Sequence, residues 1–62
     1  MQIYSYRKDK LTGNHTAAIN TFNNLFTAFT YTESKSFKTL EAAQKWMAKR
    51  GFINILEIEE IN

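Results

Sequence analysis

The stretch Ser36–Phe52, SFKTLEAAQKWMAKRGF, specifies its own structure at almost every position. Thr39 is a good helix N-cap, because its hydroxyl can accept a hydrogen bond from a free backbone N–H of the first turn. The apolar residues that follow recur at helical spacing: Leu40, Ala43 and Met47. Gly51 suits the left-handed position that ends a helix, and Phe52 can fold back onto Met47 in a Schellman ending. These signals predict a helix between Thr39 and Gly51.

The whole chain is small for an independent fold. Its 62 residues form a single expected domain, residues 1–62, and a chain of this size buries only about 60% of its unfolded surface. With no cysteine and one histidine, it lacks the residues for a disulfide, a thiolate metal site or an imidazole cluster. We therefore expect no metal and no cofactor. Five Phe, three Tyr and one Trp indicate an aromatic core, self-association, or both.

Composition also indicates a location and a class of partner. No apolar run is long enough to cross a membrane and the N-terminus lacks a signal-peptide pattern, so a cytoplasmic protein without membrane contact is expected. The net charge of +2 is uneven, because three glutamates lie near the C-terminus: Glu57, Glu59 and Glu60. The preceding body carries roughly +5 and can attract a polyanion.

Residues N-terminal to the helix predict strands. Gln2–Lys8 alternates as a strand does, and Asp9–Asn14 is polar enough for a loop. His15–Thr32 is ambiguous, because it fits either two strands joined at Asn23–Asn24 or a helix with apolar residues at helical spacing. Its many Thr and Asn residues are poor helix formers, so the hairpin is favoured.

Both faces of that hairpin are apolar. One face carries smaller residues: Ala17, Ile19, Phe26 and Ala28. The other carries larger ones: Ala18, Phe22, Leu25, Phe29 and Tyr31. The small-residue face suits the space under the helix, which leaves the aromatic face to a partner chain, a ligand or the curl of the sheet itself. The interface prediction therefore names Phe22, Leu25 and Phe29.

The remaining segments complete an α+β prediction. Glu33–Ser36 reads as a polar connection into the helix, and the β-branched residues after Gly51 predict a final strand. The expected order is β-β-β-α-β, a small antiparallel sheet with one helix packed on one face. The helix crossover favours a last strand parallel to an earlier one, the first strand being the best candidate.

Little in the sequence predicts an enzyme. His15 lacks a recognisable carboxylate or nucleophile partner and reads as a surface histidine. The alternating Glu57 and Glu59 fit a charged strand edge that discourages aggregation. The chain has no Gly-rich phosphate loop, metal-ligand spacing or nucleophile elbow. A non-enzymatic binding module is predicted.

Cations interleaved with tyrosines predict a nucleic-acid site. Basic residues follow the first strand and precede the helix: Arg7, Lys8, Lys10, Lys35 and Lys38. Three tyrosines lie among them: Tyr4, Tyr6 and Tyr31. If the sheet brings these segments together, cations would contact phosphates while tyrosines stack on bases.

The helix segment also resembles known families. Residues 34–51, with Phe37-x-Thr39, Ala43 and Trp46, are similar to the end of the arm-type DNA-binding domains of phage and transposon integrases. Like plant AP2-type domains, these lay a three-stranded sheet against one helix and place the sheet in the major groove. The motif Phe-x-Thr-Leu-Glu-x-Ala is also similar to a motif in the small hybrid-binding domain of some ribonucleases H. The resemblance implies a DNA-binding module of phage or mobile-element origin.

Two functions thus follow from the sequence. The first is nucleic-acid binding through the basic and aromatic residues. The alternative is protein interaction or homodimerisation through the apolar hairpin and the last strand, motivated by apolar strands in a chain too small to cover them.

Overall fold

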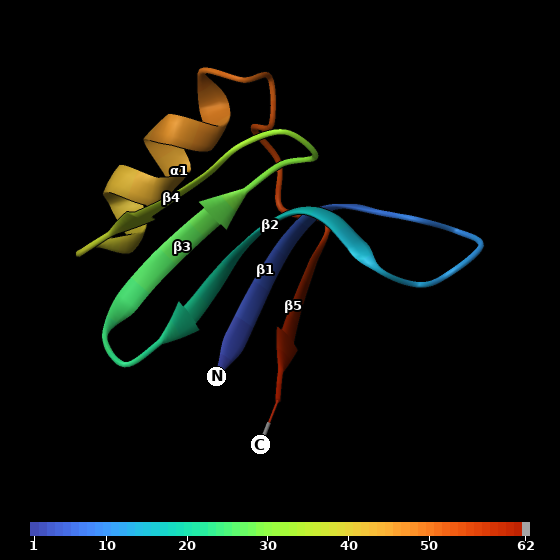
Figure 1. Ribbon diagram of the computed structural model, residues 1–62, viewed down its shortest axis with the longest axis horizontal. Helices are drawn as coiled ribbons and strands as arrows, with labels where there is room; N and C mark the ends of the chain where they lie inside the picture. Colours follow the sequence, from blue (N-terminus) through green and yellow to red (C-terminus); the bar gives the residue numbers. More distant parts are fainter. Residues whose placement is uncertain (62) are drawn as a thin grey trace.

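The computed structural model describes residues 1–61 and shows one five-stranded antiparallel sheet with a single helix on one side (Figure 1). In chain order, the elements are β1 (Gln2–Lys8), β2 (His15–Phe22), β3 (Leu25–Phe29), β4 (Ser34–Phe37), α1 (Leu40–Ala48) and β5 (Glu57–Glu60). The strands lie in the order β4-β3-β2-β1-β5, so β4 and β5 are the edges. The predicted α+β class is confirmed.

The hairpin predicted around Asn23–Asn24 is confirmed. Both asparagines have positive φ, 52° and 63°, and Phe22 pairs with Leu25 across the turn. A two-residue hairpin turn of this kind needs positive φ at both positions, which asparagine tolerates. The helical alternative for residues 15–32 is therefore wrong.

The polar connection predicted at Glu33–Ser36 is wrong for most of its length, because Ser34–Phe37 forms β4. A tight turn precedes it, in which the Thr30 N–H donates to the Glu33 carbonyl at 2.8 Å. Across the ladder, the hydroxyls of Thr27 and Ser36 lie 2.9 Å apart. An edge strand exposed to solvent needs no apolar alternation, so its sequence resembles a loop. The element order is β-β-β-β-α-β.

The expectation of a parallel last strand is also wrong, because β5 pairs antiparallel with β1. β4 ends level with the start of β1, since Phe37, Phe26, Thr21 and Gln2 lie in one row. The nine residues of α1, roughly 13 Å long, then carry the chain back along the sheet. β5 therefore begins beside the end of β1 and runs against it.

Both predicted helix ends are confirmed. The Ala42 N–H donates to the Thr39 hydroxyl at 3.2 Å. At the other end, Gly51 has a φ of +88° and its N–H donates to the Ala48 carbonyl at 3.0 Å. The Phe52 N–H reaches the Met47 carbonyl at 3.1 Å, which completes the Schellman pattern.

The core lies between the helix and the small-residue face of the hairpin, as predicted. Ile19, Ala28 and Met47 are each 0% exposed within one cluster. The helix contacts β3 and β4, whereas Phe52 reaches toward β1 and meets the Tyr6 ring edge-on, with the centroids 6.4 Å apart. We call this side the helix face and the opposite side the open face.

The strand directions also give the sheet two distinct ends (Figure 1). At the loop end lie the β1–β2 loop, the β3–β4 turn and the end of α1. At the hairpin end lie the Asn23–Asn24 turn and the start of β1. Met1 and Ile61 pair there, so the two ends of the described residues also meet at the hairpin end.

Candidate functional site

The basic residues predicted to form one patch lie in two separate places. Arg7, Lys8 and Lys10 are at the loop end, on β1 and in the loop that follows it. Lys35 lies on edge strand β4, and Lys38 follows that strand at the hairpin end. Three strand spacings separate β4 from β1, which is roughly 14 Å across the sheet. The sheet does not bring these two groups together.

Several of these cations already have neighbours. The Lys8 Nζ lies 3.6 Å from a Glu57 carboxylate oxygen, in an ion pair between β1 and β5. The Arg7 guanidinium lies 5.9 Å from the centroid of the Phe52 ring, and the Lys35 Nζ lies 5.6 Å from that of Phe37. Lys10 and Lys38 are exposed.

The predicted tyrosines differ in their surroundings. Tyr6 is buried in the core, and its burial raises the pKa of its hydroxyl. Tyr4 is half-buried beside the core, and its hydroxyl donates to the Gln2 side-chain oxygen at 2.7 Å. Tyr31 is 76% exposed in the β3–β4 turn. Of the three, only Tyr31 presents its ring to solvent for stacking.

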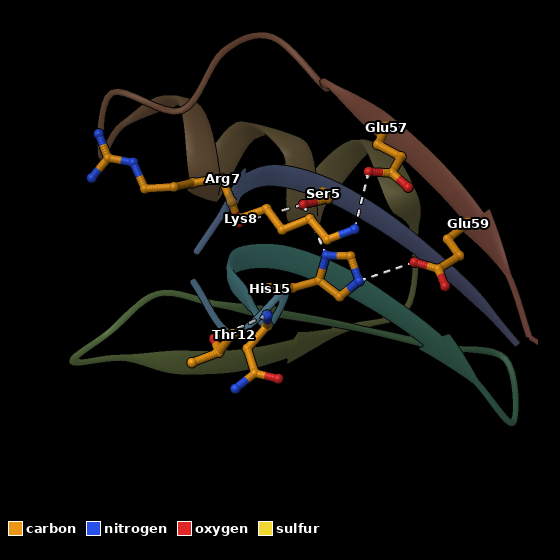
Figure 2. Close-up of polar contacts among 8 residues, drawn as sticks. Ser5, Arg7, Lys8, Thr12, His15, Glu57 and Glu59 are labelled. Atoms are coloured by element: carbon orange, nitrogen blue, oxygen red, sulfur yellow. Dashed lines mark hydrogen bonds and ion pairs between the residues drawn. The ribbon is translucent and has the colours of Figure 1, made fainter. Parts of the chain in front are cut away.

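His15 is not the surface histidine expected from the sequence. Figure 2 shows its ring between Ser5 and Glu59, with the Lys8–Glu57 pair alongside. The Nδ1 lies 3.0 Å from the Ser5 hydroxyl, and the Nε2 lies 3.1 Å from a Glu59 carboxylate oxygen. The contacts connect β2 to β5 across the intervening β1.

Two irregularities in the β1–β2 ladder place His15 there. Ser5 pairs with Ala18 but Arg7 with Ala17, so β1 has one extra residue, and the next pair, Lys8 with His15, leaves an extra residue on β2. Strict alternation from Ala17 would place His15 on the helix face. The extra residue on β2 turns the side chain to the open face, an effect that β-bulges have on single side chains.

The Ser5–His15–Glu59 cluster contains residue types used in hydrolases, but its geometry is suited to a structural role. Ser5 is 2% exposed, so its hydroxyl is inaccessible to a substrate. A nucleophile must be within reach of the reacting atom before its activation matters. Within residues 1–61, no group of three or more acidic, histidine or cysteine side chains is arranged to hold a metal ion.

The open face carries an apolar row at the hairpin end that the sequence predicted only in part. Phe22 and Leu25 of the predicted interface are 65% and 45% exposed and pair across the hairpin turn. Met1 continues the β1–β2 ladder opposite Phe22 and is 48% exposed, and Ile61 pairs with Met1 and is 39% exposed. We call these four residues the apolar row. The third predicted interface residue, Phe29, is half-buried further along the same face.

The sequence contained a signal for the two missed members of the row. Met1 alternates with Ile3, and Ile61 alternates with Glu59, so each points to the open face once its strand is placed. A groove of about 590 Å³ adjoins the row at the hairpin end and is lined by Met1, Phe22 and Leu40, among others. In residues 1–61 no helix has the length and apolar character to span a bilayer.

Comparison with known proteins places the chain in a family. Residues 9–51 match the family model described as "Protein of unknown function (DUF1391)". This match covers the β1–β2 loop, the next three strands and the helix, which is most of the chain. Neither a curated protein nor a solved structure matches the sequence. The chain therefore belongs to the DUF1391 family of proteins of unknown function.

Proposed function

We propose that this protein is a small interaction module that self-associates through the open face of its sheet. The observation that carries the proposal is the apolar row, in which β2, β3 and the residues flanking β1 and β5 each present one large exposed apolar side chain. A sheet normally buries its apolar face against a second layer, and here the helix supplies that layer on one side only. A second copy of the chain can supply it on the other.

The distribution of charge on the open face supports one particular stacking of two copies. β5 presents Glu57 and Glu59 on this face, whereas Lys35 of β4 pairs with Ala28 and therefore lies on the helix face. When two open faces stack about a two-fold axis that runs parallel to the strands between β1 and β2, β5 of each copy lies over β3 of the other, which has no charged residue. The glutamates of the two copies then stay apart, whereas the alternative stacking of β5 over β5 brings like charges together.

The same two-fold arrangement matches apolar residues to apolar residues. The row runs Ile61, Met1, Phe22, Leu25, with Ile61 directly after β5 and Met1 directly before β1. Reversing its direction in the second copy sets Ile61 over Leu25 and Met1 over Phe22. Stacked sheets lie about 10 Å apart, a distance that side chains of this size fill from both sides.

The proposal is tested by sedimentation velocity over a micromolar to millimolar concentration range, on the wild type and two matched variants. Leu25→Ser removes an apolar side chain from the row, and Leu11→Ser removes one that is 96% exposed in the β1–β2 loop. A dimer that Leu25→Ser weakens by about tenfold or more, and that Leu11→Ser leaves unchanged, supports the proposal. A wild type that stays monomeric throughout, or equal effects of both variants, would overturn it.

Nucleic-acid binding is the second candidate, favoured by one specific feature rather than by the full predicted patch. That feature is the exposed Tyr31 ring near Arg7 at the loop end. The phage or mobile-element origin implied by the resemblance and the cytoplasmic location expected from the sequence both stay predictions.

A further inference from the structure

A second groove lies at the loop end, on the helix face of the sheet. Its volume is about 270 Å³, near the lower end for small-molecule sites. β1 contributes Arg7, the β3–β4 turn contributes Tyr31, and the end of α1 contributes Arg50 with Phe52 beyond it. The groove opens on the side away from the apolar row, so self-association through the open face leaves it accessible.

Two arginines and Glu33 line the groove, and one of the two arginines, Arg7, has no carboxylate partner among residues 1–61. Arg50 is neutralised by Glu33, which it meets through two hydrogen bonds of 2.8 and 3.0 Å. Arg7 makes no ion pair with any of residues 1–61, and its guanidinium lies over the Phe52 ring. A guanidinium supported on an aromatic ring keeps its outer N–H donors available to an anion.

An aromatic ring and hydroxyl groups accompany this charge. Tyr31 is 76% exposed and shares the groove with Arg7. The threonines Thr16, Thr30 and Thr32 also line it. The Thr30–Glu33 hydrogen bond closes the turn that carries Tyr31, so the ring is held near the groove. A planar ring beside a single cation is the pairing that binds a base together with its phosphate.

We propose that this groove binds one nucleotide of a single-stranded nucleic acid, an inference that rests on nucleic-acid binding, the second candidate function above. The base stacks on Tyr31, the phosphodiester accepts hydrogen bonds from Arg7, and the exposed Lys10 at the same end of the sheet lies near the neighbouring phosphates.

The charge of the groove favours a phosphodiester over a phosphate monoester. A phosphodiester carries a single negative charge, whereas a phosphorylated side chain carries −1.5 to −2 and is bound by clusters of free arginines. Here the second arginine is occupied by Glu33. The groove thus matches the singly charged ligand.

The distribution of charge on the sheet favours a single strand over a duplex. Glu57 and Glu59 lie on the open face, where the neighbouring Lys8 is already paired with Glu57. A duplex docked on that face would bring its phosphates toward these carboxylates. The unpaired cation and the exposed ring lie together at the loop end, where unstacked bases can reach them.

Fluorescence anisotropy of a fluorescein-labelled oligothymidylate at low salt tests the proposal. Tyr31→Ala is expected to weaken binding about tenfold, and Tyr31→Phe, which keeps the ring, to stay within about twofold of the wild type. Arg7→Gln is expected to weaken binding and to reduce the slope of log K against log salt concentration by about 0.7. Lys45→Gln removes the same charge from the exposed helix surface and is the matched control, expected to leave affinity and slope unchanged.

Each result of the anisotropy measurements either supports or overturns the proposed nucleotide site. Binding of the single strand that is tighter than that of a duplex of the same length, with the Tyr31 and Arg7 effects above, supports the groove. No anisotropy change with the wild type would overturn it. Equal losses for Lys45→Gln and Arg7→Gln, tighter binding of the duplex, or displacement of the strand by free phosphotyrosine would also overturn it.

Discussion

Glu33 holds Arg50 through two parallel hydrogen bonds, from Nε to Oε2 at 2.8 Å and from Nη2 to Oε1 at 3.0 Å. The same guanidinium lies 3.7 Å from the centroid of the Trp46 ring and donates from Nη1 to the Trp46 carbonyl at 3.2 Å. One side chain thus joins the β3–β4 turn to the end of α1. Because its charge is paired with that of Glu33, Arg50 adds no free charge to the adjacent groove.

Glu33→Gln is predicted to make the protein less sensitive to acid. The hydrogen bonds from Arg50 lower the pKa of Glu33, so the carboxylate contributes stability above its unfolded pKa and loses that contribution as the pH falls through the folded pKa. The difference in unfolding free energy between wild type and Glu33→Gln should therefore be present at neutral pH and shrink below about pH 4.5. Urea unfolding followed by circular dichroism across this range measures it.

Glu41→Gln is the control for this titration, since Glu41 meets Lys45 at 3.5 Å on the exposed helix surface. A wild-type advantage over Glu33→Gln that persisted unchanged into acid would contradict the role given to Glu33.

Met47→Ala is predicted to destabilise the fold by about 2–5 kcal/mol, because Met47 is 0% exposed and joins the helix to the sheet. Ile53→Ala, at a side chain that is 73% exposed, should change stability by less than about 0.5 kcal/mol. Urea unfolding of both variants provides the comparison. Equal losses of unfolding free energy in the two variants would show that the core lies elsewhere.

Asn24→Val is predicted to lower the free energy of unfolding by about 1–2 kcal/mol, because Asn24 has a φ of 63° and a β-branched residue is strained in the left-handed region. Asn24→Gly should leave the stability unchanged or raise it, since glycine adopts this conformation freely. Thermal unfolding distinguishes the two substitutions. A valine variant as stable as the glycine variant would argue against the hairpin turn.

Added salt is predicted to act in opposite directions on the two proposed interactions. Association through the apolar row should persist or strengthen in sulfate, because excluded salts favour burial of apolar surface. Binding of the oligothymidylate should weaken, because salt competes for the phosphates. Sedimentation and anisotropy over the same salt series measure both, and parallel weakening would indicate that the self-association is electrostatic.

Local signals predicted the elements whose structure is set within a few residues. The Thr39 cap and the Gly51 ending define α1, and two asparagines with positive φ define the hairpin. β4 was not predicted because Ser34–Phe37 is a polar edge strand without apolar alternation. Its ladder with β3 stabilises it. The direction of β5 depends on where α1 returns the chain, which no local pattern specifies.

In the candidate sites too, residues placed by local sequence were predicted, whereas those placed by the pairing of distant strands were missed. Phe22 and Leu25 were predicted from alternation within one hairpin, whereas Met1 and Ile61 join them only through the pairing of β1 with β5. The contacts of His15 depend on two extra residues in the β1–β2 ladder. The basic residues divide into two groups because β1 lies in the sheet interior and β4 at its edge.

The most direct test of the self-association is an isotope-filtered nuclear Overhauser measurement on a mixture of labelled and unlabelled chains at high concentration. The two-fold stacking predicts contacts between copies from the Ile61 methyls to the Leu25 methyls and from the Met1 methyl to the Phe22 ring. Contacts confined to the backbone edges of β4 and β5, or none at all between copies, would contradict it.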